Sequence, residues 1–577
     1  MSGFDETFDF VIVGSGAGGM CAALVQRAAG RSVVVLEKTE LLGGTTSRSG
    51  GVMWIPNNPF MNQQGIPDSY EQAKTYLDSV IGTPPDAPGA TEARRHAYLT
   101  EGPRMLEFLM QQGVPLRRVA YWPDYYDDRP GGSAPGRCVI AELFDVNTLG
   151  EWKPKLRPSS IVLPAQLVPG AIGRMLVTRG IQFVAARIDE MLRLGSDTRT
   201  LGGKLIGLRV IARTLWARRR GREYLAGGAS LQGHMLRAGL RLGAQYRTQS
   251  PVSELIVEGG KVVGVVTVRD GKPWRIAARN GVLVNAGGFA HNQRMRDQYQ
   301  PGTRAEWSMT PKGDTGEMIE EMARQGARLA QLGEFVGNQQ TISPGAEQAE
   351  MKPGAQSVTA KPHCILVDQS GVRYMNEGGS YMAYCKGMLE RNKTVPAVPS
   401  YAIFDSQYIR KYPVGGTMAG ADKPQAWYDK GYLRRGDTVE ALAQQLKMDP
   451  AQLKGTVERW NRFVANQRDE DFQRGARAYD RWLGDPFHKP NATLGAISEG
   501  PFYAVPVVPG DVGTYGGAVT DEYARVLRAD GSVIAGLYAC GVSTASVMGP
   551  VYPGAGASIG PSATFGFIAA RHAAGLA

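Results

Sequence analysis

The sequence predicts an α/β fold of the Rossmann type, assembled from both ends of the chain, with an α+β domain inserted between them. Phe8 to Val13 alternates apolar residues as a buried strand does, and it leads into a glycine loop, Gly14-x-Gly16-x-x-Gly19, that opens an Ala-rich helix. Ser32 to Leu36 predicts the next strand and completes a βαβ unit. Near the other end, Val533 to Ala539 predicts a similar strand followed by glycine-rich chain.

The glycine loop and the acidic residue after the second strand form a dinucleotide-binding fingerprint. The glycines permit a tight turn that brings backbone N–H groups and a helix N-terminus against a pyrophosphate. Glu37 follows Gly19 by eighteen residues and can accept hydrogen bonds from ribose hydroxyls. NAD and FAD fit this pattern equally well, and a plain glycine-rich turn is the alternative. The residues predicted to contact the dinucleotide here are Gly14, Ser15, Gly16, Ala17, Gly18, Gly19, Glu37 and Lys38.

Composition places the chain among large globular proteins of a reducing compartment. Its 577 residues are 43% hydrophobic and 21% charged, enough to bury a large core, and its 74 glycines gather in short motifs without a collagen-like period. The five cysteines are scattered and odd in number, which argues against a disulfide framework or a cysteine metal site. We see neither a signal peptide nor an apolar run of about 18 residues, and we expect a cytoplasmic protein without a metal.

The pattern of elements divides the chain into two domains. Residues 1–295 and 501–577 carry the strand-glycine units and form the first domain. Residues 296–500 lack such units, carry helical stretches at 316–326 and 438–465, and form the second, inserted domain.

Two further segments of the first domain have simple patterns. Glu254 to Val268 predicts a hairpin that turns at Gly259-Gly260. The mixed, Pro-rich region from about 60 to 170 contains the aromatic and acidic run 121–128, and we interpret it as loop.

Residues 171–225 predict a basic helical insertion. Residues 171–250 hold fourteen Arg and one Lys against four acidic residues, so this stretch alone accounts for the net charge of +11. From Lys204 to Trp216, apolar residues are interleaved with Arg at helical spacing, which suits a membrane surface. A solvated basic helix packed on its own domain explains the pattern equally well. Nucleic acid ranks last, because the aromatic residues are not spaced as stacking platforms.

Three further motifs resemble the flavin contacts of the fumarate reductase and succinate dehydrogenase flavoprotein superfamily. They are Gly43-Gly44-Thr45-Thr46 with Ser49-Gly50-Gly51, Asn285-Ala286-Gly287-Gly288, and Gly536-Leu537-Tyr538-Ala539-Cys540-Gly541. The resemblance covers nearly the whole chain and implies FAD as the cofactor. Because no His lies between Gly43 and Gly51, we expect FAD to be bound non-covalently. The further cofactor-binding residues that it implies are Gly43, Gly44, Thr45, Thr46, Ser49, Gly50, Gly51, Ala286, Gly287, Gly288, Gly541, Ala557, Ser558 and Ile559.

Within that superfamily, the C-terminal motifs resemble the 3-ketosteroid Δ1-dehydrogenases. The resemblance is carried by Gly516-Gly517, by Ser546-Val547-Met548-Gly549 and, most specifically, by Tyr552-Pro553-Gly554-Ala555-Gly556. It implies that the Tyr552 hydroxyl and the Gly556 N–H bind the steroid 3-keto oxygen. Such an oxyanion hole stabilises enolate-like charge and acidifies the neighbouring C2–H bond.

The same resemblance implies a tyrosine as general base. Asn376-Glu377-Gly378-Gly379-Ser380-Tyr381 matches the family's motif, which makes Tyr381 the base, and the assisting tyrosine is Tyr125 or Tyr126, with Tyr125 preferred. Because the ordinary pKa of tyrosine is about 10, the site must favour the phenolate through a neighbouring hydroxyl or a cation. The implied reaction is 1,2-desaturation, in which hydride passes from C1 to flavin N5 and the C2 proton passes to Tyr381.

Other functions fit the sequence as well. A ketosteroid dehydrogenase acting at C4–C5 and a fumarate-reductase-like alkene reductase share the superfamily motifs. From a different class, the basic insertion fits a membrane- or nucleic-acid-binding protein with a vestigial flavin fold. For the preferred interpretation we expect a 3-ketosteroid substrate, an electron acceptor such as a quinone, no nucleic acid, and peripheral contact with the cytoplasmic membrane through residues 171–225.

Overall fold

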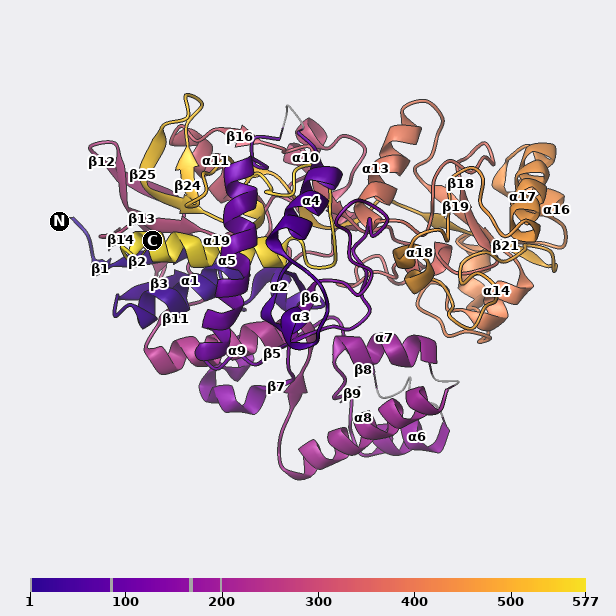
Figure 1. Ribbon diagram of the computed structural model, residues 1–577, viewed down its shortest axis with the longest axis horizontal. Coiled ribbons are helices and arrows are strands. Elements are labelled where there is room, and N and C mark those ends of the chain that lie inside the picture. The colour runs from indigo at the N-terminus through magenta and orange to yellow at the C-terminus, as the bar shows by residue number, and fades with distance from the viewer. Residues whose placement is uncertain (1–2, 84–86, 165–169, 198–199, 577) are drawn as a thin grey trace.

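The core of the molecule is a six-stranded, mostly parallel sheet (Figure 1). The computed structural model describes residues 3–83, 87–164, 170–197 and 200–576. Five strands are parallel, and β24 pairs antiparallel at one edge. In spatial order the strands are β11 (Gln245–Arg247), β3 (Val33–Leu36), β2 (Phe10–Val13), β15 (Val282–Val284), β25 (Val533–Ala539) and β24 (Arg525–Leu527). The central strands are buried on both faces, which explains their continuous apolar sequences.

Both ends of the chain meet in this sheet, as the motifs predict. β2 and β3 come from the N-terminal part and β25 from the C-terminal part, and helix α1 (Ala17–Ala28) packs against the last helix, α19 (Ile559–Ala573). Glycines permit this approach. A Cβ on Gly18 would lie 2.4 Å from the carbonyl oxygen of Ser562, and one on Gly566 would lie 2.2 Å from that of Gly18.

A second, four-stranded sheet confirms the predicted hairpin. Its strands, in spatial order, are β1 (Glu6–Phe8), β14 (Lys272–Ala278), β13 (Lys261–Arg269) and β12 (Glu254–Glu258). β12 and β13 pair antiparallel and turn at Gly259 and Gly260, which both have positive φ.

The region from 60 to 170 is not the loop that we expected. It contains helices α4 (Tyr70–Ile81) and α5 (Glu92–Gln111), together with two strands of a small sheet formed by β4 (Met53–Trp54), β6 (Cys138–Ala141) and β5 (Leu116–Arg118). The hydroxyls of Ser69 and Thr91 cap the two helices by accepting from the N–H groups of Gln72 and Arg94. These caps and buried apolar faces outweigh the prolines, and the run 121–128 lies within the irregular stretch 119–137.

The inserted domain is built on an antiparallel sheet. Its strands, in spatial order, are β18 (Cys364–Val367), β19 (Ser400–Phe404), β21 (Phe502–Val507) and β20 (Arg434–Gly436). The predicted boundary at 501 cuts through this sheet, because β21 pairs with β19 and β20. The boundary at 295 also differs, since α11 (Glu317–Arg324) packs into the core of the first domain.

The predicted helix at 438–465 is two helices, α16 (Val439–Leu446) and α17 (Pro450–Ala465). Lys447 has a φ of +60°, and Asp449 caps α17, so the chain turns between them.

The other elements are α2 (Gly44–Arg48), α3 (Pro59–Gln63), β7 (Phe144–Asp145), β10 (Tyr224–Leu225), α9 (Gly227–Leu242), α10 (Gln293–Tyr299), β16 (Leu329–Ala330), β17 (Phe335–Gly337), α12 (Gln356–Thr359), α13 (Tyr381–Asn392), α14 (Ser406–Lys411), α15 (Gln425–Asp429), α18 (Ala478–Leu483), β22 (Asp511–Thr514), β23 (Gly517–Ala518) and the 3-10 helices 146–155, 305–307 and 541–543.

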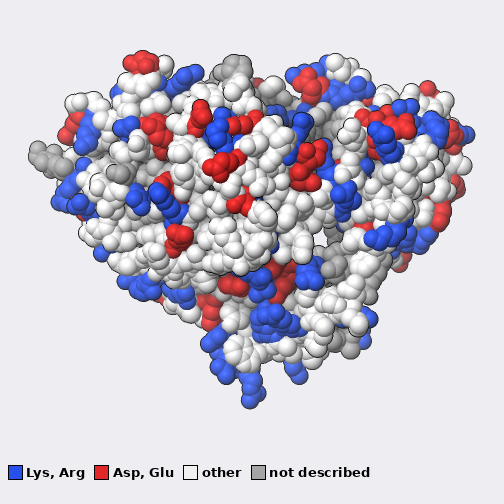
Figure 2. Space-filling model, viewed as in Figure 1, with Lys and Arg blue, Asp and Glu red and all other residues white. Residues whose placement is uncertain are grey.

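The basic insertion forms a separate lobe, at the bottom of Figure 1. It contains α6 (Gly170–Thr178), α7 (Ile188–Asp197), α8 (Leu201–Arg219), β8 (Leu163–Pro164) and β9 (Phe183–Val184), around a small apolar core of its own. Figure 2 shows Lys and Arg gathered over this lobe. Among the described residues, no helix is both long and apolar enough to cross a membrane.

Candidate active site

A cavity of about 720 Å³ reaches from the glycine loop to a group of tyrosines. Gly14, Gly16, Glu37 and Gly287 line what we call the glycine half, at the carboxyl ends of the parallel strands, where doubly wound sheets bind ligands. Tyr125, Tyr381, Tyr552 and Gly556 line what we call the tyrosine half. One continuous space therefore joins the two sets of predicted residues.

The glycine half fits a dinucleotide. Gly14 has a φ of +95°, and a Cβ there would lie 2.3 Å from the carbonyl oxygen of Asn285, so the loop requires glycine. Gly16 begins helix α1 without any side-chain cap and lines the cavity. The positive end of the helix dipole is thus directed at the space where a pyrophosphate would lie.

Glu37 lines the cavity and also holds the glycine loop in place. Its carboxylate accepts from the Ser15 hydroxyl at 2.6 Å and from the backbone N–H and hydroxyl of Thr39 at 2.9 Å each. Ser15 in turn accepts from the N–H of Gly43 at 2.7 Å. Each carboxylate oxygen can accept more than one hydrogen bond, so Glu37 can hold the loop and still accept from a ribose.

The structure separates the predicted cofactor-binding residues into two sets. Those on the wall are Gly14, Ser15, Gly16, Glu37, Lys38, Gly44, Thr45, Thr46, Ser49, Gly50, Gly51, Ala286, Gly287, Ser558 and Ile559. Those behind the wall are Ala17, Gly18, Gly19, Gly43, Gly288, Gly541 and Ala557. The glycines of the second set are needed for close packing: a Cβ on Gly288, for example, would lie 1.9 Å from the Thr514 hydroxyl oxygen.

Several residues of the wall escaped the sequence reasoning. They include Thr39, Arg48, Arg157, Ile161, Ile188, Ser250, Ser253, Asp314, Glu317 and Arg324. Arg48 lies within the glycine-rich segment but is buried, donates to the Met309 carbonyl at 3.2 Å and pairs with Glu350. Burial raises the pKa of Asp314 to about 6. Apart from Thr39 and Arg48, folding brings these residues together from segments outside the motifs, so no local motif marks them.

In the tyrosine half, three of the predicted tyrosines face one another. The ring centroids of Tyr381 and Tyr552 are 5.3 Å apart, those of Tyr125 and Tyr381 are 5.2 Å apart, and those of Tyr125 and Tyr552 are 6.0 Å apart. All three rings line the cavity. Tyr126 instead places its ring against the guanidinium of Arg477, 5.9 Å from the ring centroid. Of the two candidates that the sequence left unresolved, Tyr125 lines the cavity and Tyr126 does not.

The hydroxyl of Tyr552 converges with backbone N–H groups. It lies 3.0 Å from the Ser558 hydroxyl oxygen. Burial raises the pKa of Tyr552, whereas hydrogen bonding to Ser558, to Tyr381 and to the N–H of Gly556 lowers it. Gly556 has a φ of +92°, and a Cβ there would lie 2.2 Å from the Val52 carbonyl oxygen. The Tyr552 hydroxyl and the Gly556 N–H thus lie close together on the cavity wall, as an oxyanion hole formed by a phenol and an N–H requires.

The turn that carries Tyr552 is fixed from three sides. The Pro553 carbonyl accepts from the Tyr76 hydroxyl at 2.7 Å and from the Tyr125 N–H at 2.9 Å. Gly554 packs on the ring of Trp54, where a Cβ would lie 2.3 Å from Cδ1. The same turn thereby ties the segment of Tyr125 to the segment of Tyr552.

A buried ion pair supports this turn from behind. The Trp54 indole N–H donates to Asp124 Oδ1 at 2.8 Å, and Arg137 Nη1 donates to Asp124 Oδ2 at 2.5 Å. Arg137 also bonds Asp68, and all three charged side chains are fully buried. Asp124 directly precedes Tyr125, so the ion pair helps to fix where that ring lies.

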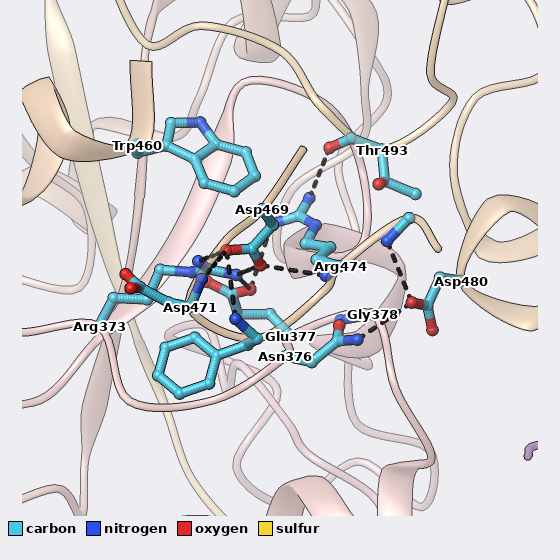
Figure 3. Close-up of polar contacts among 12 residues, drawn as sticks. Arg373, Asn376, Glu377, Gly378, Trp460, Asp469, Asp471, Arg474, Asp480 and Thr493 are labelled. Carbon is cyan, nitrogen blue, oxygen red and sulfur yellow. Dashed lines mark hydrogen bonds and ion pairs between the residues drawn. The ribbon is translucent and has the colours of Figure 1, made fainter. Parts of the chain in front are cut away.

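A second buried ionic cluster holds the segment that leads to Tyr381 (Figure 3). Arg373 binds both Glu377, at 2.6 Å, and Asp469, at 2.6 Å. The guanidinium groups of both Arg373 and Arg474 contact the ring of Trp460, at 4.8 and 5.0 Å from its centroid. Because removing one partner would leave buried charge unpaired, this cluster fixes the Asn-Glu motif in place.

The electrostatics of Tyr381 are balanced between opposing effects. Burial raises its pKa well above the usual value, and so does the neighbouring Tyr552, whereas a hydrogen bond from Tyr125 lowers it. Tyr125 is thus the contact that favours the phenolate in the structure of the protein alone.

Comparison with known proteins identifies the family. Residues 9–559 match the family model described as FAD binding domain. The chain is 38% identical over 586 residues to a 3-oxosteroid 1-dehydrogenase of Mycobacterium tuberculosis, covering 99% of this chain and 98% of the relative. The chain belongs to the FAD-binding 3-oxosteroid 1-dehydrogenase family. Another relative is the 4-oxocyclohexanecarboxylate 2-dehydrogenase of Sinomonas cyclohexanicum, 33% identical, with 99% of this chain and 94% of the relative covered.

Solved structures of this family confirm the fold. The 3-ketosteroid delta1-dehydrogenase of Sterolibacterium denitrificans, solved in complex with 1,4-androstadiene-3,17-dione, superposes with a TM-score of 0.88. It is 35% identical and covers 99% of this chain and all of that one. The resemblance drawn from the sequence is therefore confirmed. Like the rest of the 3-oxosteroid 1-dehydrogenase family, the chain is an FAD-dependent oxidoreductase, which sets aside a vestigial flavin fold.

Proposed function

We propose that the chain catalyses the FAD-dependent 1,2-desaturation of a 3-ketosteroid. The observation that carries this proposal is the convergence of Tyr552 and Gly556 beside Tyr381, in a cavity continuous with the dinucleotide loop. Relatives named 3-oxosteroid 1-dehydrogenase and the solved complex with 1,4-androstadiene-3,17-dione support the substrate class.

The oxyanion hole supplies the first part of the chemistry. The Tyr552 hydroxyl and the Gly556 N–H donate to the 3-keto oxygen of the steroid. Charge moves onto this oxygen as the C2–H bond weakens, and preorganised donors stabilise that charge most strongly in the transition state.

Proton removal supplies the second part. Tyr381 accepts the C2 proton as a phenolate, and the Tyr125 hydroxyl favours that phenolate by donating a hydrogen bond to it. FAD, when bound by the glycine half, supplies the acceptor for the hydrogen of C1. The buried rings of Tyr125 and Tyr552, with the partly buried ring of Tyr381, limit the access of water to the reacting carbons.

A direct assay tests this function. Purified protein is incubated with androst-4-ene-3,17-dione and an artificial dye acceptor, and NMR locates the new double bond. We expect a C1–C2 alkene. A C4–C5 alkene formed from a saturated 3-ketosteroid would indicate the Δ4 alternative, and no turnover of either steroid would overturn the proposal.

The relative that acts on 4-oxocyclohexanecarboxylate favours one second candidate, a monocyclic ketone of the same local chemistry. Both substrates present a ring ketone beside the carbons to be desaturated. Comparison of kcat/KM for the steroid and for 4-oxocyclohexanecarboxylate separates them. We expect the higher kcat/KM for the steroid, because Ile161 and Ile188 add apolar surface to the cavity wall.

We also propose that the basic lobe rests on an anionic lipid surface. Leu201, Leu205 and Leu208 lie along one side of α8 and are 80%, 65% and 61% exposed. This apolar stripe faces away from the lobe's own core, to which α8 contributes Val210 from its other side. Lys204 and Arg209 are exposed beside these leucines in the sequence, and further exposed cations of the lobe are Arg174, Arg179, Arg193, Arg218, Arg219, Arg220 and Arg222. An apolar stripe flanked by cations is typical of interfacial helices.

Vesicle binding tests this contact. We expect the protein to co-sediment with vesicles containing phosphatidylglycerol, and the triple variant Leu201→Ser, Leu205→Ser, Leu208→Ser to bind about tenfold less. Met418→Ser, at an exposed apolar position outside the lobe, is the control. Binding to DNA fragments but not to vesicles would favour a nucleic-acid surface instead.

With the lobe on the inner face of the cytoplasmic membrane, a quinone becomes the natural electron acceptor, and supplied ubiquinone or menaquinone should then replace the dye.

A further inference from the structure

Tyr479 extends the tyrosine cluster beyond the cavity wall. It lies in α18, is 1% exposed, and its ring centroid is 4.3 Å from that of Tyr125. The Tyr479 hydroxyl oxygen accepts a hydrogen bond from Gln356 Nε2 at 3.1 Å. Neither sequence motif nor family resemblance marked this residue, which stands behind Tyr125 as seen from the cavity.

The hydrogen bonds of Gln356 indicate which group donates and which accepts at the Tyr479 hydroxyl. The same Nε2 also donates to the carbonyl oxygen of Gly379 at 3.2 Å. A carbonyl only accepts, so the amide must present its NH₂ group to both partners. The Tyr479 oxygen is therefore an acceptor toward Gln356, and Tyr479 and Tyr125 are hydrogen-bonded to each other through their hydroxyls. When Tyr479 donates in that bond, the proton of Tyr125 is available to Tyr381.

We propose that Tyr479 is a positioning residue for the general base: together with Gln356 it directs the Tyr125 hydroxyl toward Tyr381 and so favours the phenolate that removes the substrate proton. The inference rests on the proposed function, in which Tyr381 is the base. Hydrogen bonds aligned donor to acceptor polarise one another in a buried site, so a donor two steps away strengthens the last bond of the chain.

The surrounding structure fixes the spacing that such a chain needs. Asn376, in the motif before Tyr381, donates to Asp480 Oδ2 at 3.0 Å, and Asp480 directly follows Tyr479 (Figure 3). Asp127, two residues after Tyr125, accepts from the N–H groups of Ala478 and Tyr479 at 3.0 and 2.9 Å. The segments that carry Tyr125 and Tyr381 are thus both bonded to the start of α18, which carries Tyr479.

The test compares wild type with Tyr479→Phe, which removes the hydroxyl and keeps the ring. Flavin reduction by androst-4-ene-3,17-dione is followed by stopped flow between pH 6 and 10, with protiated and C2-deuterated steroid. We expect the rate at pH 7 to fall about three- to tenfold, the deficit to shrink toward pH 10, and the C2 deuterium isotope effect to increase. A rise of about half to one unit in the pKa of Tyr381 corresponds to this factor.

Two further variants keep the test decisive. Gln356→Glu replaces the donor by an acceptor and should shift the profile further in the same direction. Tyr432→Phe removes another buried hydroxyl of the inserted domain, one bonded to Thr341 at 2.7 Å, and should leave the profile unchanged.

Two outcomes for Tyr479→Phe overturn the inference: a profile that superimposes on that of wild type, or a loss by the same factor at every pH with an unchanged isotope effect. Neither touches the proposed function, provided wild type reduces its flavin with the steroid and Tyr381→Phe does not. If wild type itself fails to react, the proposed function fails first.

Discussion

The two halves of the cavity are made from different parts of the polypeptide. The glycine half is largely backbone, formed by short motifs in which the required residues are neighbours in sequence. The tyrosine half is side chains, and Tyr125, Tyr381 and Tyr552 come from three segments far apart in the chain. In the proposed function, the glycine half binds the dinucleotide and the tyrosine half carries out the reaction. Substitutions in each half should separate these two properties.

The largest effect is expected for Tyr381→Phe. Loss of a general base typically costs about 10²- to 10⁴-fold in rate, so steroid turnover should nearly disappear while the flavin absorbance of the purified protein stays. Tyr126→Phe, one residue from Tyr125 but outside the cavity wall, is the matched control and should remain within about threefold of wild type. Substantial turnover by Tyr381→Phe would remove the base from the proposed mechanism.

Tyr552→Phe should have the next largest effect. Removal of one oxyanion-hole donor typically costs about 10²- to 10³-fold in kcat, and the flavin should again remain bound. Tyr515→Phe serves for comparison, because its ring lies 5.8 Å from that of Tyr552 while its hydroxyl bonds the Ala557 carbonyl. Equal losses in the two variants would mean that packing, and not the ketone contact, explains the effect.

In the glycine half, Gly14→Ala should have the opposite effect and weaken flavin binding more than it impairs turnover by the flavin-loaded protein. The new Cβ meets the Asn285 carbonyl oxygen, so the loop must move, and we expect about tenfold weaker retention of FAD, with turnover largely restored by excess cofactor. Gly30→Ala imposes the same kind of positive φ where no atom lies within 4 Å of the new Cβ, and it should keep its flavin. Flavin content per chain, read from the absorbance spectrum, decides between these expectations.

The effect of pH on the rate of the wild-type protein is the most gradual of these effects. Burial raises the pKa of Tyr381, so the base is mostly protonated at neutral pH. The deprotonated fraction then grows by up to about tenfold for each pH unit, and the rate of flavin reduction should rise accordingly until the protein loses stability. A rate independent of pH between 6 and 9 would argue against a tyrosine base.

Predictability from sequence differed between the halves for a physical reason. A tight glycine loop is dictated by local backbone geometry, so Gly14, Gly16 and Glu37 could be placed from spacing alone. Gly18 and Gly288, predicted in the same way, do not line the cavity, and a Cβ at either position would meet neighbouring atoms. The loop assigned to 60–170 was wrong because helix caps and buried faces outweighed the prolines.

The tyrosine half was predictable only through resemblance, and incompletely. The motifs gave Tyr381 and Tyr552, yet the choice between Tyr125 and Tyr126 depended on which ring the buried Asp124 and its partners turn toward the cavity.

The sequence by itself determined the βαβ unit, the dinucleotide loop and the family, because these depend on residues a few positions apart whose backbone preferences are local. Only the tertiary structure decided that Tyr125 faces Tyr381, that Tyr479 stands behind it, and that one side of α8 is left uncovered. Side chains from distant segments meet only when whole domains pack, and such packing is a property of the complete fold that no short motif encodes.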